Sequence, residues 1–244
     1  MITKELSMAQ VIMEHQQLIP LLPRFNIKMG FGHKSVEQVC QQYGVNTCFF
    51  LEICNSYIYE DYTATKDLSL FSLETMVDYL KNTHHYYTAI AFPALEQNIA
   101  ELISDSELSI EKKDLVFNFF NDYKRNFLEH IQKEEEIILP YILELEIQYR
   151  QEKADEYFIR KVKKYSINDF ALEHDRLETS LTNLSKLIIQ YLPPFENWVL
   201  CHRILMDLCR LVKDLTDHGN MEDKVLIPRV SELEHSLLQK NREA

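Results

Sequence analysis

Two stretches of the chain share one pattern and decide its fold: HIQKEEEIILP at residues 130–140 and HGNMEDKVLIP at residues 218–228. Each begins with a histidine, places a glutamate four residues later and reaches a proline ten residues after the histidine. Residues four apart on an α-helix lie on one face, one turn apart. The two stretches therefore predict an internal repeat in which two helices each carry an imidazole and a carboxylate on the same face.

The sequence around the repeat predicts four long helices within residues 68–244. They are expected at about 73–103 behind the N-cap Ser72, at about 110–150 behind Ser109, at about 168–191 before Pro193-Pro194, and at about 195–238. Short connections between the first and second helices, and between the third and fourth, favour antiparallel neighbours. We therefore expect an all-α protein with an up-down-up-down four-helix bundle.

Prolines fall inside three of these helices, at Pro93, Pro140 and Pro228, and should kink them or end their regular portions. Regular helical periodicity also predicts which residues face the core. The expected stripes are Leu73, Val77, Leu80, His84, Tyr87, Ala91 and Leu95; Phe120, Tyr123, Phe127, His130, Glu134, Ile137 and Tyr141; Phe170, His174, Leu177, Leu181, Leu184 and Ile188; and Leu211, Leu215, His218, Glu222 and Val225.

Composition restricts the class of protein. The 244 residues include only 4 Gly, where average usage would give roughly 17. Strand-rich folds use glycine in hairpins and nucleotide-binding α/β folds use it in phosphate loops, so both classes are disfavoured. A net charge of −12 argues against nucleic acid and against an anionic membrane surface as partners.

Residues 1–62 are expected to form a separate small helical domain. Its helices are predicted at about 4–19, 34–43 and 46–60, and the acidic stretch 60–67 is the expected linker. The five cysteines are an odd number without CxxC spacing, which favours reduced thiols. Because no signal peptide and no apolar run of roughly 18 residues is present, we expect a cytoplasmic protein without a membrane span.

Histidines recur at nearly equal spacing along the four expected helices. His85, His130, His174 and His218 follow one another at intervals of 45, 44 and 44 residues. Helices of similar length in an antiparallel bundle bring residues at such intervals to similar depth. The spacing therefore predicts that these histidines lie at one level of the bundle.

Glu134 and Glu222 interrupt core-facing stripes that are otherwise apolar. An unpaired carboxylate in such a place costs several kcal/mol, whereas a cation compensates its charge. A single core histidine is more often a hydrogen-bonded packing residue, but four coincident sites, two with a carboxylate one turn away, favour a metal centre. Histidine and carboxylate ligands suit iron or manganese, and two glutamates can hold two ions roughly 3.5–4 Å apart.

The first of the four helices leaves a choice between two adjacent histidines. Periodicity favours His84, which shares a stripe with Leu80 and Tyr87. His85 shares a flank with Lys81, which is a poorer core face. The residues alone leave both histidines as candidates.

At these residues the sequence resembles the hemerythrin-like superfamily and, within it, the di-iron repair-of-iron-centres proteins. In that family a ligand histidine precedes a proline as His85 precedes Pro93 here. The other family motifs match His130 with Glu134, His174 within Glu-His-Asp, and His218 with Glu222 before Ile-Pro-Arg. The resemblance implies a centre of two iron ions bridged by Glu134 and Glu222, with His85, His130, His174 and His218 as the other ligands and His84 as the alternative to His85.

The sequence departs from the family pattern in two places. The family has a further ligand histidine between the first two bundle motifs, whereas no histidine lies between His85 and His130 here. Water, or a carboxylate such as Glu96, Glu101 or Asp105, could fill that position. The family also carries a Cys-Cys pair in the N-terminal loop that residues 30–33 occupy, and this chain has none there.

The resemblance implies a role in nitrosative or oxidative stress. It predicts either iron donation to damaged iron–sulfur clusters or reduction of nitric oxide at the di-iron site, with iron–sulfur proteins as partners. The alternative is an oxygen or nitric oxide carrier or sensor without turnover. A homodimer is a further expectation, and whether the protein is an enzyme is left open.

Overall fold

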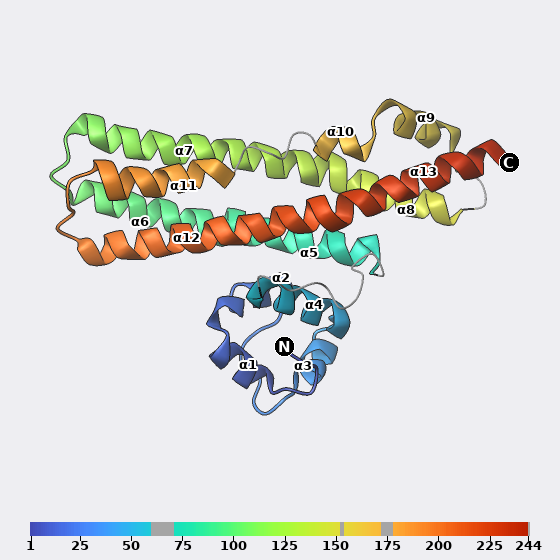
Figure 1. Cartoon of the computed structure of the whole chain (residues 1–244), viewed down its shortest axis with the longest axis horizontal. Coiled ribbons are helices and arrows are strands. Elements are labelled where there is room, and N and C mark those ends of the chain that lie inside the picture. The colour runs from blue at the N-terminus through green and yellow to red at the C-terminus, as the bar shows by residue number, and fades with distance from the viewer. Residues whose placement is uncertain (60–70, 152–153, 172–177, 244) are drawn as a thin grey trace. The chain divides into compact units, whose positions relative to one another are not determined.

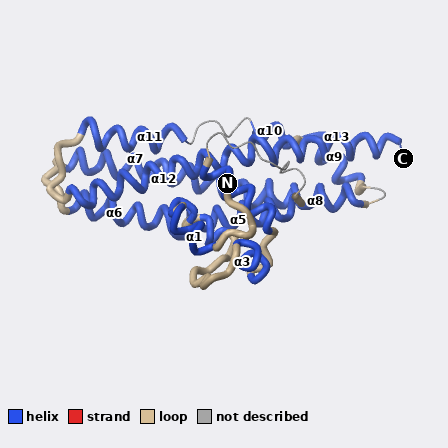
Figure 2. The backbone as a smooth tube through the Cα atoms, turned by 60° about the horizontal axis from the view of Figure 1, so that its bottom comes forward, coloured by secondary structure: helices blue, strands red, loops and turns tan. Residues whose placement is uncertain are grey.

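The computed structural model describes residues 1–59, 71–151, 154–171 and 178–243, and within them the chain forms helices and no β-strand (Figure 2). The all-α fold class is therefore confirmed. Contacts divide the chain into two compact units, Met1–Tyr86 and Tyr87–Ala244. The expected linker at 60–67 lies outside the described residues.

The first unit begins with short helices, which are α1 (Met8–Glu14), a 3₁₀ turn η1 (Gln16–Leu18), α2 (Leu21–Arg24), α3 (Val36–Gln42) and α4 (Thr47–Ile58). A capping box starts α3, because Ser35 accepts from the amide of Gln38 while the Gln38 side chain accepts from the amide of Ser35. Gly44, at φ +67°, ends it. The expected helix at 4–19 is shorter than predicted, since it starts behind the extended Ser7 and breaks at His15.

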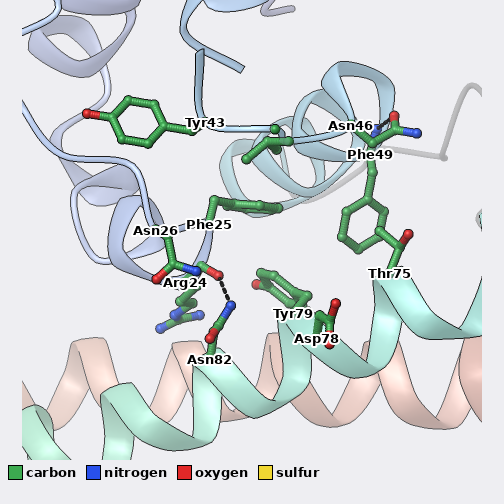
Figure 3. A pocket seen from close by; sticks show the side chains of 12 residues that line it. Arg24, Phe25, Asn26, Tyr43, Asn46, Phe49, Thr75, Asp78, Tyr79 and Asn82 are labelled. Atoms are coloured by element: carbon green, nitrogen blue, oxygen red, sulfur yellow. Dashed lines mark hydrogen bonds between the residues drawn. The ribbon is translucent and has the colours of Figure 1, made fainter. Parts of the chain in front are cut away.

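The last helix of the first unit is α5 (Leu73–Tyr86), which packs against α2. The Asn82 side chain donates to the backbone carbonyl of Arg24 at 2.8 Å, as Figure 3 shows. Phe25 packs edge-on against Phe49 and tilted against Tyr79, with ring centroids 6.0 and 5.1 Å apart. These contacts border an open cavity of about 260 Å³.

The second unit contains the remaining helices, interrupted by five-residue π-helical segments. They are η3 (Tyr87–Ala91, π), α6 (Phe92–Ser104), α7 (Ile110–Lys133), η4 (Glu134–Ile138, π), α8 (Leu139–Arg150), α9 (Glu156–Lys164), α10 (Ile167–Ala171), α11 (Glu178–Lys186), η5 (Leu187–Tyr191, π), α12 (Trp198–Met221), η6 (Glu222–Leu226, π) and α13 (Ile227–Glu243). The predicted long helices at 73–103 and 110–150 match continuous helical runs. The fourth starts three residues later than expected and extends to residue 243.

Four helices of the second unit contact one another in a ring. α6 contacts α7, α7 contacts α11, α11 contacts α12, and α12 contacts α6. The connections from α6 to α7 and from α11 to α12 lie at the same end of this group (Figure 1). Aromatic side chains fill part of the interior, where Phe92 lies 4.9 Å from Phe127 and 6.3 Å from Phe120 between ring centroids.

The other half of the second unit is tied together by a buried carboxylate. Glu234 on α13 accepts from the Tyr141 hydroxyl at 2.5 Å and from the backbone amide of Ile167 at 3.0 Å. Burial raises the pKa of the Glu234 carboxyl. This carboxylate therefore joins α8, α13 and the start of α10 in one hydrogen-bonded cluster.

Ahead of each of the three prolines the regular helix ends, as predicted, but the helical run continues. Each regular helix ends seven residues before its proline, a π-segment follows, and α-helix resumes so that Pro93, Pro140 and Pro228 occupy its second position. Proline lacks the backbone N–H and its ring clashes with the carbonyl four residues earlier. In a π-segment each N–H bonds to the carbonyl five residues earlier, so the turn contains one extra residue and the clash with the proline ring is avoided.

Because each π-segment contains an extra residue, three of the predicted core positions are not fully buried. Ile137 is 54% exposed, and Ala91 and Val225 are only half-buried. In each helix the buried positions move on, to Ile138 in the second and to Leu226 in the fourth. The prediction was wrong at these positions because it assumed 3.6 residues per turn throughout.

This shifted register predicts different costs for truncating two adjacent isoleucines. Ile138→Ala should destabilise the protein by about 2–5 kcal/mol because Ile138 is buried, whereas Ile137→Ala should cost less than about 1 kcal/mol. Urea unfolding followed by circular dichroism measures both values. Equal costs would show that the π-segment does not set the register.

No helix in the described part of the chain combines the length and the apolar character that crossing a membrane requires.

Candidate metal centre

Glu134 and Glu222 occupy the same structural position in the two repeated stretches. Each is the first residue of a π-segment, directly after a regular helix. The Glu134 amide donates to the carbonyl of His130, and the Glu222 amide donates to the carbonyl of His218. The histidine and glutamate of each stretch are therefore one α-helical turn apart, as the H-x3-E spacing predicted.

The side chains within each pair are close together. His130 Nε2 lies 3.1 Å from Glu134 Oε1, and His218 Nε2 lies 3.4 Å from Glu222 Oε1. Both glutamates are buried, and so is His218, while the His130 side chain keeps 16% of its surface exposed. Each helix thus presents an imidazole nitrogen and a carboxylate oxygen in one place.

Four side chains form a buried group that could hold a metal ion. His84, Glu134, His218 and Glu222 each offer one ligand atom, and these atoms all lie within 4.8 Å of one another. All four residues are buried. Two imidazoles and two carboxylates are a donor set that suits divalent first-row metals.

The other predicted ligands among the described residues are not part of this buried group. His85 is exposed and does not belong to the buried group, whereas its neighbour His84 does. His130 lies beside Glu134 but is not among the four side chains of that group. His174 lies outside the described residues. His84, which helical periodicity favoured, is therefore the histidine of α5 that lies in the buried group.

The carboxylates considered as replacements for the missing family histidine lie on α6 or directly after it. Glu96 pairs with Lys124 at 2.7 Å, and Glu101 and Asp105 are exposed. None of the three belongs to the buried group. The group therefore draws its acids from the repeated stretches.

The two buried carboxylates create an unfavourable charge in the protein alone. Burial, and then the nearby carboxylate of Glu134, raise the pKa of Glu222 well above its ordinary value of 4.5. Bringing two anions together in an apolar interior is costly unless a cation or protons compensate them. The residues present therefore fit a bound cation.

An aromatic wall borders the group. The Tyr87 ring is fully buried and stands edge-on to His218 and Phe127, at 5.7 and 5.6 Å between ring centroids. Its hydroxyl donates to the backbone carbonyl of Asp214 at 3.3 Å. Tyr87 therefore packs against the His218 ring and is hydrogen-bonded to α12, the helix that carries His218.

Asp214 is a buried acid that sequence reasoning missed. It is 5% exposed and stands one turn before His218 on α12, so Asp214, His218 and Glu222 follow one another at four-residue intervals. The signal was present in the sequence as an extension of the H-x3-E spacing by one turn. The predicted core stripe of this helix included Leu211 and Leu215 but not Asp214, so this acid was not recognised as a buried residue.

The first unit holds three cysteines, of which Cys48 is exposed. Cys40 and Cys54 are buried, and both are free thiols. Burial raises the pKa of Cys40 to about 11 and raises that of Cys54 well above 9.0. Both thiols are therefore protonated at neutral pH and serve as packing groups.

The chain matches no family model, no curated protein and no solved structure.

The raised pKa of Glu222 predicts a pH-dependent stability of the metal-free protein. The folded state binds the Glu222 carboxyl proton more tightly than the unfolded chain does. The contribution of this proton to the free energy of unfolding is therefore complete below about pH 4.5, and it is lost as the pH rises through the pKa of Glu222 in the folded state. Relative to Glu222→Gln, the metal-free wild type should lose up to about 1.4 kcal/mol per pH unit in that window.

Urea unfolding of chelator-treated protein between pH 5 and 8 measures the difference. The exposed Glu232→Gln serves as the matched control and should follow the wild type. Parallel stability curves for wild type and Glu222→Gln would contradict the assigned environment of Glu222.

Proposed function

We propose that the protein binds two iron ions between Glu134 and Glu222 and uses this centre in the response to nitrosative or oxidative stress. The observation that carries the proposal is the buried group of two imidazoles and two carboxylates with ligand atoms within 4.8 Å. The fold proposed with it is an up-down-up-down bundle of the hemerythrin-like kind, preceded by a small helical domain. The ring of contacts among α6, α7, α11 and α12 supports that topology.

The proposed ligands are taken from the observed geometry and, for a residue outside the described part of the chain, from the sequence. Glu134 and Glu222 would bridge the ions, because both are buried and each has a second carboxylate oxygen to offer. His84 and His218 would be imidazole ligands from the buried group, and His130 would join through its position beside Glu134. His174 enters from the sequence spacing alone.

Iron is proposed because of the balance of donors. Imidazole with carboxylate suits non-haem iron, whereas a single zinc ion would leave ligands over and calcium disfavours so many nitrogen donors. Iron bound here would supply redox chemistry and an open position for a small ligand. Tyr87 and Phe127 would exclude water from one side, and Glu134 and Glu222 would balance the metal charge.

The activity proposed is repair of damaged iron–sulfur clusters, by iron donation or by nitric oxide reduction. The supports are the combined motifs of the sequence and the absence of a family-type fifth histidine between His85 and His130. A centre with fewer imidazoles releases iron more readily and leaves room for nitric oxide. Iron–sulfur proteins would be the partners of the donation route, and the cytoplasm would be the compartment.

A carrier or sensor of oxygen or nitric oxide is the second candidate. The fully buried Tyr87 beside His218 favours it, since a dry apolar wall protects a bound gas from proton-driven side reactions. In this alternative the same residues bind metal, and only the fate of the gas differs.

Metal analysis of purified protein tests the centre. We expect about two iron ions per chain in the wild type, and loss of at least half of them in Glu134→Ala, Glu222→Ala and His84→Ala. His85→Ala is the matched control, because its exposed side chain is adjacent to His84 and should be replaceable without loss of iron. Full iron content in both glutamate variants would show that the site is elsewhere.

Stopped-flow spectroscopy of the reduced, iron-loaded protein separates the two functions. Formation of nitrous oxide on mixing with nitric oxide, or transfer of iron to a damaged iron–sulfur protein, is expected for the repair function. Reversible gas binding without product would instead identify a carrier or sensor. Wild-type protein that reacts with neither gas and donates no iron would contradict both.

A further inference from the structure

We propose that Pro140 and Pro228 are positioning residues of the metal centre: they enforce the π-segments that begin at Glu134 and Glu222 and so direct both carboxylates into the site. This inference rests on the proposed metal centre. Neither proline belongs to the buried ligand group, and both are exposed. Their effect would be exerted through the backbone.

The burial pattern requires an enlarged turn at each glutamate. Glu134 and Leu139 are both buried, at 1% exposure each, although they are five residues apart. Glu222 and Ile227, also five apart, are 3% and 5% exposed. In a regular α-helix residues five apart point about 140° away from each other, so one of each pair would leave the core.

The backbone hydrogen bonds show how the enlarged turn is made. The Leu139 amide donates to the carbonyl of Glu134, and the Ile227 amide donates to the carbonyl of Glu222, which are both i→i+5 bonds. The amide of each glutamate, in contrast, donates four residues back to a histidine carbonyl. Each glutamate therefore stands where an α-helical turn passes into a π-helical turn, and its backbone is held from both sides.

Proline stands directly after each of these i→i+5 bonds. Pro140 follows Leu139 and Pro228 follows Ile227, so the next amide that could close a regular turn is missing. In a regular helix the Pro140 ring would also clash with the carbonyl of Glu136. The proline thus disfavours the α-helical alternative at the position where the glutamate needs a wider turn.

The same offset recurs where no glutamate is present. Tyr87 begins a π-segment six residues before Pro93, and Leu187 begins one six residues before Pro193. The four segments share the proline but not the first residue, so the proline is the common cause. Only the two segments that begin with glutamate deliver a carboxylate to the buried group.

The decisive variant removes the proline and the extra residue together. Pro228→Ala combined with deletion of the exposed Lys224 allows an ordinary α-turn while the former Ile227 still shares a face with Glu222. Pro140→Ala combined with deletion of the exposed Glu136 does the same in the second helix. In both designs the residue after the turn keeps the face that it has in the wild type, and an α-helical turn replaces the π-helical one.

Co²⁺ is the probe, because its visible absorption reports ligand geometry independently of any activity. We expect at least tenfold weaker Co²⁺ binding in each combined variant, which is the loss of affinity typical when a residue that supports a metal ligand is changed. The visible spectrum should also change, while the helical circular dichroism signal is retained. Pro194→Ala, which changes a proline outside the helices, should match the wild type.

Unchanged Co²⁺ affinity and spectrum in the combined variants would overturn the inference while leaving the metal centre standing. If a deletion variant fails to fold, Pro228→Ala and Pro140→Ala decide alone, and wild-type affinity and spectrum in both would overturn it. A wild-type protein that binds no Co²⁺ and no iron would instead overturn the proposed centre together with this inference.

Discussion

The structure depends on how two carboxylates can be buried among aromatic and aliphatic side chains. Glu134 and Glu222 lie in the interior of the second unit, each with an imidazole one helical turn away. Burial and the nearby Glu134 carboxylate raise the pKa of Glu222, so this environment disfavours its charged form. A cation between the helices would remove that cost, which links the stability of the fold to the chemistry of the site.

That requirement extends to the shape of the helices. A helix that carries a buried glutamate must keep its apolar face inward on both sides of it, and a proline six residues on prevents an ordinary turn. The π-segments satisfy both demands by adding one residue. Such π-segments occur four times in the described part of the chain.

The N-terminal unit follows a different plan. Its helices are short, capped by Ser35 and Asn46, and packed through the aromatic contacts of Phe25, Phe49 and Tyr79. Its buried thiols have raised pKa values, so they contribute packing and not thiolate chemistry.

The sequence by itself determined the all-α class, the extent of the first two long helices and the pairing of histidine with glutamate, because spacing, caps and scarce glycine are local properties. It also favoured His84 through periodicity, whereas the resemblance favoured His85. Only the tertiary structure decided that Ile138 and not Ile137 is buried. The reason is physical: one extra residue in a π-helical turn changes the face of the residues that follow it, and spacing counted at 3.6 residues per turn does not reveal that turn.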